Sequence, residues 1–134
     1  MSNKEQRVIY PEQAPSYYND WKFSPAIESQ GFIFVSGCTG TMDNGVVPDG
    51  ITAQTRQAFH RIGMCLDEAG VSFADIVEMT TYHVGLKSHL EEFRAAKDEF
   101  IVEPYPAWTA IGVSELASEG ALVEIRVVAK RRVT

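Results

Sequence analysis

The sequence has few cysteines and few basic residues for its length. Its 134 residues include two cysteines, Cys38 and Cys65, which form no Cys-x-x-Cys pair. Neither a disulfide framework nor a cysteine-ligated zinc site is indicated, and we expect free thiols in a reducing compartment. Eighteen Asp and Glu residues against twelve Lys and Arg give a formal charge of −6. Because nucleic-acid affinity depends on Lys and Arg neutralising phosphates, we expect no nucleic-acid partner.

Long apolar runs are also missing. The longest uncharged run, residues 29–42, falls short of the roughly 18 apolar residues that cross a bilayer. Residues 1–5 have no apolar stretch behind their charges, so we expect no secretory signal. These patterns indicate a cytoplasmic protein without a membrane partner. The composition, 45% hydrophobic and 22% charged, is that of a folded chain, and the length fits one domain over residues 1–134.

Several motifs of cofactor and metal chemistry are absent as well. The sequence has no Gly-x-Gly-x-x-Gly, no phosphate loop and no His-Glu-x-x-His, so we expect no cofactor and no metal. His60, His83 and His89 show no ligand spacing, and we interpret them as surface or strand-face histidines. Ser36 lacks the Gly-x-Ser-x-Gly elbow. It is therefore a weak candidate nucleophile, but its hydroxyl at a strand end could bind a ligand.

What the sequence does contain is an alternation of strand and helix patterns. β-Branched and aromatic runs predict strands, and apolar residues spaced by three and four predict helices. The predicted strands are residues 26–28, 32–37, 76–84, 107–113 and 122–130. One helix is predicted over residues 51–69 with Gly70 as its C-cap. A second begins at a capping box of Ser88 and Glu91 and ends before Pro104.

This order predicts an α+β fold with both helices on one face of a sheet, because right-handed crossovers can place them on the same side. The other sheet face would be bare. Since exposed apolar surface costs roughly 25 cal/mol per Å², we expect that face to be buried against other copies of the chain.

The last predicted strand carries a carboxylate of interest. Period-two alternation places Glu124 and Arg126 on one face and Val123 and Ile125 on the other. One interpretation is a surface ladder between Glu124 and Arg126. The other is a carboxylate at a subunit seam that positions or activates water.

An ordered series of motifs points to a known family. The series is Phe-Ile-Phe-Val-Ser-Gly (32–37), Ala-Gln-Thr-Arg-Gln (53–57) followed by Gly70, Asp-Ile-Val (75–77), Thr-Thr-Tyr (80–82), Tyr-Pro-Ala (105–107), Val-Glu-Ile (123–125) and Ala-Lys-Arg-Arg (129–132). From about residue 23 to the C-terminus, the chain resembles the Rid (reactive intermediate deaminase) family, also called YjgF or L-PSP-type endoribonuclease.

The resemblance implies a fold, an assembly and a chemistry. The fold would be chorismate-mutase-like α+β, assembled as a homotrimer whose sheets form a central barrel with ligand clefts between subunits. Members of the best-known type hydrolyse reactive imines and enamines, such as 2-aminoacrylate, to a ketoacid and ammonia without metal or organic cofactor. In that type a C-terminal glutamate, here Glu124, holds the attacking water.

One departure from the family pattern affects the expected substrate. Family members place an arginine clamp for the substrate carboxylate after Pro-Ala, where this chain has Trp108. An indole has one N–H and no charge, so it cannot replace the paired charge-assisted hydrogen bonds. Arg126 or Arg94 could compensate, or both could face solvent. Cys38 stands where glutamine is common, and a packing role for its thiol is favoured over a reactive thiolate.

The sequence therefore predicts a hydrolytic deaminase of imines, enamines or a related small metabolite, with Trp108 as a stacking wall for an aromatic, larger or uncharged substrate. The predicted site consists of catalytic Glu124 and substrate-binding Ser36, Gly37, Cys38, Arg94, Tyr105, Trp108, Ala110 and Arg126. One alternative is a ketoacid- or metabolite-binding protein without turnover. Another is an endoribonuclease, which conflicts with the acidic charge. The aromatic residues 15–23 either cover the cleft or fix the first strand to the sheet.

Overall fold

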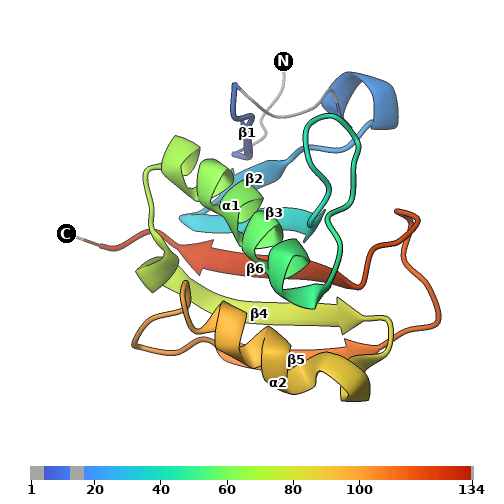
Figure 1. Cartoon of the computed structure of the whole chain (residues 1–134). Coiled ribbons are helices and arrows are strands. Elements are labelled where there is room, and N and C mark those ends of the chain that lie inside the picture. The colour runs from blue at the N-terminus through green and yellow to red at the C-terminus, as the bar shows by residue number, and fades with distance from the viewer. Residues whose placement is uncertain (1–4, 13–16, 134) are drawn as a thin grey trace.

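A computed structural model describes residues 5–12 and 17–133, and the architecture is α+β, as predicted (Figure 1). A six-stranded sheet has the order β1-β2-β3-β6-β4-β5, in which β4 and β5 are parallel and the other neighbours antiparallel. The strands are β1 (Arg7–Ile9), β2 (Ala26–Ser29), β3 (Phe32–Thr39), β4 (Ile76–His83), β5 (Ala107–Gly112) and β6 (Val123–Lys130). The helices are α1 (Ile51–Ala69) and α2 (Leu86–Lys97), with single turns η1 (Tyr17–Trp21) and η2 (Phe73–Asp75).

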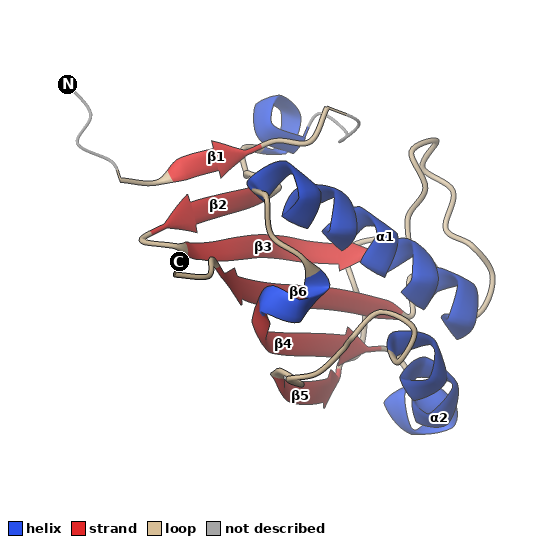
Figure 2. Cartoon of the chain, turned by 90° about the vertical axis from the view of Figure 1, so that its left-hand side faces the viewer, coloured by secondary structure: helices blue, strands red, loops and turns tan. Residues whose placement is uncertain are grey.

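Both long helices lie on the same face of the sheet, α1 over β3 and β6 and α2 beside α1 (Figures 1 and 2). Side-chain burial follows the predicted alternation of β6. Val123, Ile125 and Val127 are fully buried beneath the helices, whereas Glu124 and Arg126 on the opposite face are half-buried. This alternation is expected where one sheet face is covered.

Helix α1 ends where the sequence predicted. Gly70 has a left-handed backbone, with φ of 81°, and its N–H donates to the Asp67 carbonyl at 3.0 Å. The N–H of Val71 then donates to the Leu66 carbonyl at 3.0 Å. Glycine suits this position because other residues are strained at positive φ.

Helix α2 starts differently from the prediction. Its N-cap is Gly85, and the Ser88 hydroxyl, already inside the helix, donates to the Gly85 carbonyl at 2.7 Å. The capping box predicted at Ser88 and Glu91 is therefore wrong. The reciprocal bonds of such a box occur instead between Ser72 and Asp75, at the short turn before β4. The helix does end before Pro104, as expected.

The N-terminal region contains two elements that the sequence patterns missed. β1 is a three-residue edge strand paired with β2, and η1 carries Tyr17, Tyr18 and Trp21. Residues 1–4, which belong to the segment assessed for a secretory signal, and residues 15 and 16 of the aromatic segment lie outside the described residues. Among the described residues, no helix combines the length and apolar character needed to span a membrane.

A bulge interrupts the pairing of β3 with β6. Val35 pairs with Val127 and Cys38 with Ile125, so Ser36 and Gly37 together stand opposite one residue of β6. In a regular strand Val35 and Cys38 would face opposite sides, because they are three positions apart. The extra residue lets both point into the core, where each is at most 7% exposed.

Gln54 of α1 links the helix to the start of β6. Its amide nitrogen donates to the carbonyls of Pro48 and Gly120 at 2.8 and 3.1 Å, and its amide oxygen accepts the Leu122 N–H at 2.7 Å. The side chain is 2% exposed. One backbone group before α1 and two at the entry to β6 thus depend on one buried amide.

We expect Gln54→Leu to lower the free energy of unfolding by about 2–4 kcal/mol, because buried backbone groups would lose their partners. Gln57→Leu on the same helix, whose side chain does not make these bonds to Pro48, Gly120 and Leu122, should change it by less than about 1 kcal/mol. Urea denaturation at fixed protein concentration measures both. Equal effects of the two substitutions would contradict the linking role of Gln54.

Candidate functional site

A groove of about 440 Å³ lies at the end of β3. Five parts of the chain line it: the aromatic segment from Tyr17 to Phe23, the end of β3 at Ser36, Gly37 and Thr39, Arg61 of α1, the segment with Ala117 and Ser118, and Glu124 of β6. Three of the predicted site residues, Ser36, Gly37 and Glu124, are thus brought together within one chain. The groove combines a carboxylate, a guanidinium and aromatic walls.

Gly37 makes room for the Glu124 carboxylate. A Cβ atom built on Gly37 would overlap Glu124 Oε2 and would lie 2.9 Å from its Cδ atom. Any larger residue would therefore push the carboxylate away. Glu124 itself is half-buried, and its carboxylate forms no hydrogen bond or ion pair with residues 5–12 or 17–133. Its oxygens remain able to bind water or a ligand.

Ser36 is fixed by hydrogen bonds to the preceding segment. Its hydroxyl donates to the Ser24 carbonyl at 2.7 Å, and its backbone N–H donates to the Pro25 carbonyl at 2.9 Å. Since the hydroxyl proton is committed to a carbonyl, the oxygen can only accept a hydrogen bond from a ligand. The sequence made Ser36 only a weak candidate nucleophile, and its role as a ligand contact stays a prediction.

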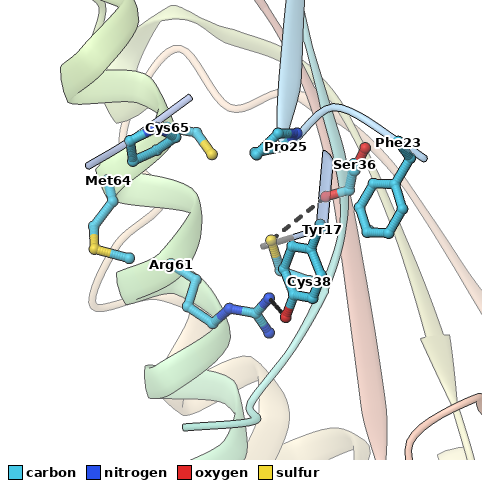
Figure 3. Close-up of a pocket in the computed structure, with 10 residues that line it drawn as sticks. Tyr17, Phe23, Pro25, Ser36, Cys38, Arg61, Met64 and Cys65 are labelled. Atoms are coloured by element: carbon cyan, nitrogen blue, oxygen red, sulfur yellow. Dashed lines mark hydrogen bonds between the residues drawn. The ribbon is translucent and has the colours of Figure 1, made fainter. Parts of the chain in front are cut away.

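Cys38 lies behind the groove in a small cavity of about 30 Å³ beside Cys65 (Figure 3). Its thiol donates to the Ser36 carbonyl at 3.4 Å, and burial raises its pKa to about 11 despite the nearby Arg61 guanidinium. Burial likewise raises the pKa of Cys65 to about 12. Both cysteines are free. Cys38 is therefore a neutral packing residue at physiological pH.

The predicted residues of β5 lie elsewhere in the chain. Trp108 and Ala110 pair with Met79 and Thr81, on the helix-covered side of the sheet, whereas Glu124 faces the other side. The exposed Tyr105 precedes β5. Within one chain these three residues do not share the groove of Glu124, and a common pocket would need a second copy. Their roles as substrate contacts stay predictions.

The two arginines considered as substitutes for the family clamp have other partners. Arg126 lies 3.5 Å from a Glu78 oxygen across the sheet, and Arg94 forms a 3.2 Å ion pair with Glu91 on the exposed side of α2. Neither lines the groove. A contribution of either from a neighbouring copy stays a prediction.

Sequence patterns missed Arg61, the cation that does line the groove. It is 8% exposed and stands among the apolar residues of α1, between Ala58 and Cys65 at helical spacing. A charged side chain at a core-facing helix position is unusual, because burying a charge is costly unless it has partners. The position of Arg61 within the apolar pattern of α1 was therefore the sequence signal that could have identified it as a site residue.

A buried polar chain holds Trp108 in place. The indole N–H donates to Thr81 Oγ1 at 2.9 Å, His83 Nε2 lies 2.7 Å from the same oxygen, and His83 Nδ1 lies 3.0 Å from His89 Nε2. Because an indole can only donate, the Thr81 proton is free to go to His83 Nε2, which leaves His83 Nδ1–H to donate to His89. His89 is buried, so its interpretation as a surface histidine was wrong.

The buried hydrogen bonds of His83 imply that the stability of the protein depends on pH. Burial, with a smaller contribution from neighbouring His89, lowers the pKa of His83 to about 4. The unfolded chain, with a His pKa near 6.5, binds a proton that the folded chain does not, so stability falls as the pH is lowered from about 6.5 toward 4. We expect a loss of about 2 kcal/mol between pH 7 and pH 5.

Urea denaturation at several pH values measures this loss. His60→Gln, which alters an exposed histidine, should leave the pH dependence unchanged, and His83→Gln should flatten it. An NMR titration that gives folded His83 a pKa near 6.5 would contradict the argument.

The close approach of Gly37 and Glu124 gives a structural prediction. A crystal structure of Gly37→Ala should show the Glu124 side chain rotated away from the bulge, because the new methyl group occupies its position. Gly112→Ala, where the nearest atom is Leu86 Cβ at 3.8 Å, serves as the matched control in another strand. An unmoved carboxylate in the Gly37 variant would show that the bulge does not set its position.

Among the described residues, no three His, Cys, Asp or Glu side chains gather as a metal site would require.

The sequence is similar to proteins of known family. The RutC family protein YjgH of Escherichia coli K12 is 35% identical over 127 residues, which cover 94% of this chain and 95% of that protein. The 2-iminobutanoate/2-iminopropanoate deaminase of Capra hircus is 30% identical over 135 residues, 96% and 93% of the two chains.

A solved structure titled Protein YJGH superposes with a TM-score of 0.87 and 34% identity, covering 98% of this chain and all of the other. The sequence pattern of the family described as Endoribonuclease L-PSP matches residues 12–131. The resemblance seen in the ordered motifs is thereby confirmed, and the chain belongs to the Endoribonuclease L-PSP family, also known as the Rid or YjgF family.

Proposed function

We propose that this protein is a hydrolytic deaminase of reactive imines and enamines, in which Glu124 orients the attacking water. The observation that carries the proposal is the Glu124 carboxylate held against Gly37 in a groove with aromatic walls. A relative from Capra hircus named 2-iminobutanoate/2-iminopropanoate deaminase, aligned over nearly the whole chain, supports the class of reaction.

The reaction needs few protein groups. Water adds through its oxygen to the imine carbon while Glu124 accepts one of its protons. That proton then passes to the nitrogen, which gives a carbinolamine. The hydroxyl proton of the carbinolamine also passes to the nitrogen, the carbon–nitrogen bond breaks with its electron pair on nitrogen, and ammonia leaves as the carbonyl forms. An enamine enters the same sequence after its tautomer, the imine, has formed. Each reaction cycle consumes one imine and one water molecule and yields one carbonyl compound and one ammonia.

Assembly belongs to the same proposal. We propose a chorismate-mutase-like homotrimer whose sheets form a barrel, with the face opposite the helices turned inward. Support comes from the apolar side chains on that face, including Phe34 and Ile111, which are 41% and 40% exposed in the single chain. In such an assembly a neighbouring copy could bring Tyr105, Trp108 and Ala110 toward a groove.

Replacing the water-orienting carboxylate tests the proposed reaction. We expect Glu124→Gln to lower kcat for imine hydrolysis by about 10²-fold or more, because an amide accepts no proton. The assay follows ammonia released from imines that an amino acid oxidase generates in the same solution. Glu119→Gln, an exposed position outside the groove, is the matched control.

Two outcomes would contradict the proposal. Unchanged ammonia release by the Glu124 variant would remove its assigned role. Saturable binding of a ketoacid by the wild-type protein without any acceleration of imine hydrolysis would favour a binding protein instead.

A further inference from the structure

Arg61 shares the groove with Glu124 but comes from a different element. Its side chain projects from the middle of α1 toward the Tyr17 hydroxyl (Figure 3). The residue is 8% exposed yet lines the groove together with Gly37 and Glu124. The Arg61 guanidinium from α1 and the Glu124 carboxylate from β6 thus line the same groove.

The Arg61 charge has no counter-ion among the described residues. Nη1 donates to the Thr39 carbonyl at 2.8 Å and Nη2 donates to the Tyr17 hydroxyl at 2.6 Å. No ion pair joins it to a carboxylate of residues 5–12 or 17–133. Two of its five N–H groups are used in this way, and a buried cation without an anion is poorly compensated. An anionic ligand would supply the missing charge.

Tyr17 adds a second donor beside the guanidinium. Its oxygen accepts the Arg61 hydrogen bond, so its own proton remains to be donated. The Arg61 guanidinium also lies 5.6 Å from the centre of the Tyr17 ring, which fixes the two groups relative to each other. A guanidinium N–H and a phenol O–H together match the two oxygens of a carboxylate.

Aromatic side chains form another part of the groove lining. The rings of Tyr17 and Phe23 stack with centroids 5.0 Å apart, and Trp21 is 75% exposed at the groove. Exposed aromatic surface next to a cavity favours a ligand that carries an aromatic or large apolar group. The cavity of about 440 Å³ has room for such a molecule.

We infer that Arg61 and Tyr17 bind the carboxylate of the substrate, and that the substrate class is 2-imino acids with an aromatic or bulky apolar side chain. The inference rests on the proposed deaminase function and deepens it. Arg61 supplies the charge-assisted hydrogen bonds that Trp108 cannot. The carboxylate lies at the α1 side of the groove, the side chain contacts Trp21 and Phe23, and the imine carbon faces Glu124.

Binding of stable analogues tests this inference apart from turnover. Phenylpyruvate, a 2-oxo acid, has the proposed shape with a carbonyl in place of the imine, and its primary amide lacks the charge. We expect the wild-type protein to bind the acid at least tenfold more tightly than the amide by isothermal titration calorimetry. Arg61→Met should weaken acid binding by tenfold or more and leave amide binding within about threefold, which abolishes the preference.

Control variants separate ligand binding from folding. Arg56→Met changes an exposed arginine of the same helix, paired with Glu99, and should preserve the preference. Tyr17→Phe removes only the hydroxyl and should lower acid affinity by about threefold to tenfold even if Arg61→Met fails to fold. A preference for the acid that survives both Tyr17→Phe and a folded Arg61→Met would overturn the inference.

The Glu124→Gln variant distinguishes this inference from the proposed function. It should keep the acid preference of the wild type while losing imine hydrolysis. If the wild type prefers the acid through Arg61 but Glu124→Gln hydrolyses imines normally, the carboxylate site stands and the water-orienting role fails. Equal affinity of the wild-type protein for the acid and the amide would overturn the carboxylate site whatever the outcome for hydrolysis.

Discussion

The bulge in β3 sets the geometry on which the groove depends. By placing two residues opposite one of β6, it keeps Val35 and Cys38 in the core and leaves Gly37 against the Glu124 carboxylate. A regular strand would turn every later residue of β3 to the other face. The bulge therefore serves both core packing and the position of the Glu124 carboxylate in the groove.

The groove joins contributions from elements far apart in the sequence. Glu124 comes from the last strand, Arg61 from the first long helix, and the aromatic wall from the turn before β2. Gln54 of α1 bonds to the segment that leads into β6, so the helix carrying the guanidinium is tied to the strand carrying the carboxylate. The two charged side chains therefore come from a helix and a strand that the Gln54 hydrogen bonds link.

Short sequence patterns predicted the features that depend on residues close together in the sequence. The β6 alternation, the Gly70 C-cap and the long strands all follow from periodicity or from a single glycine. The α2 N-terminus was misplaced because Ser88 bonds back to Gly85 within the first turn instead of capping it. β1 was missed because three residues are too short for a periodic signal.

The candidate site was only partly predictable for a different reason. Ser36, Gly37 and Glu124 belong to motifs, and they meet in the groove. Arg61 and the buried pair of His83 and His89 belong to none, because their partners are brought near by tertiary packing across 6 to 44 residues of sequence. Trp108 illustrates the same limit: its neighbours in sequence match the family, but its N–H is taken up by Thr81.

A crystal structure of the protein with bound phenylpyruvate would test the roles of Arg61, Tyr17 and Glu124 together. We expect the ligand carboxylate to lie within hydrogen-bond distance of Arg61 and Tyr17, and its carbonyl carbon to face a water molecule held by Glu124. A ligand bound elsewhere on the protein, with the Arg61 guanidinium and the Glu124 carboxylate untouched, would contradict these roles.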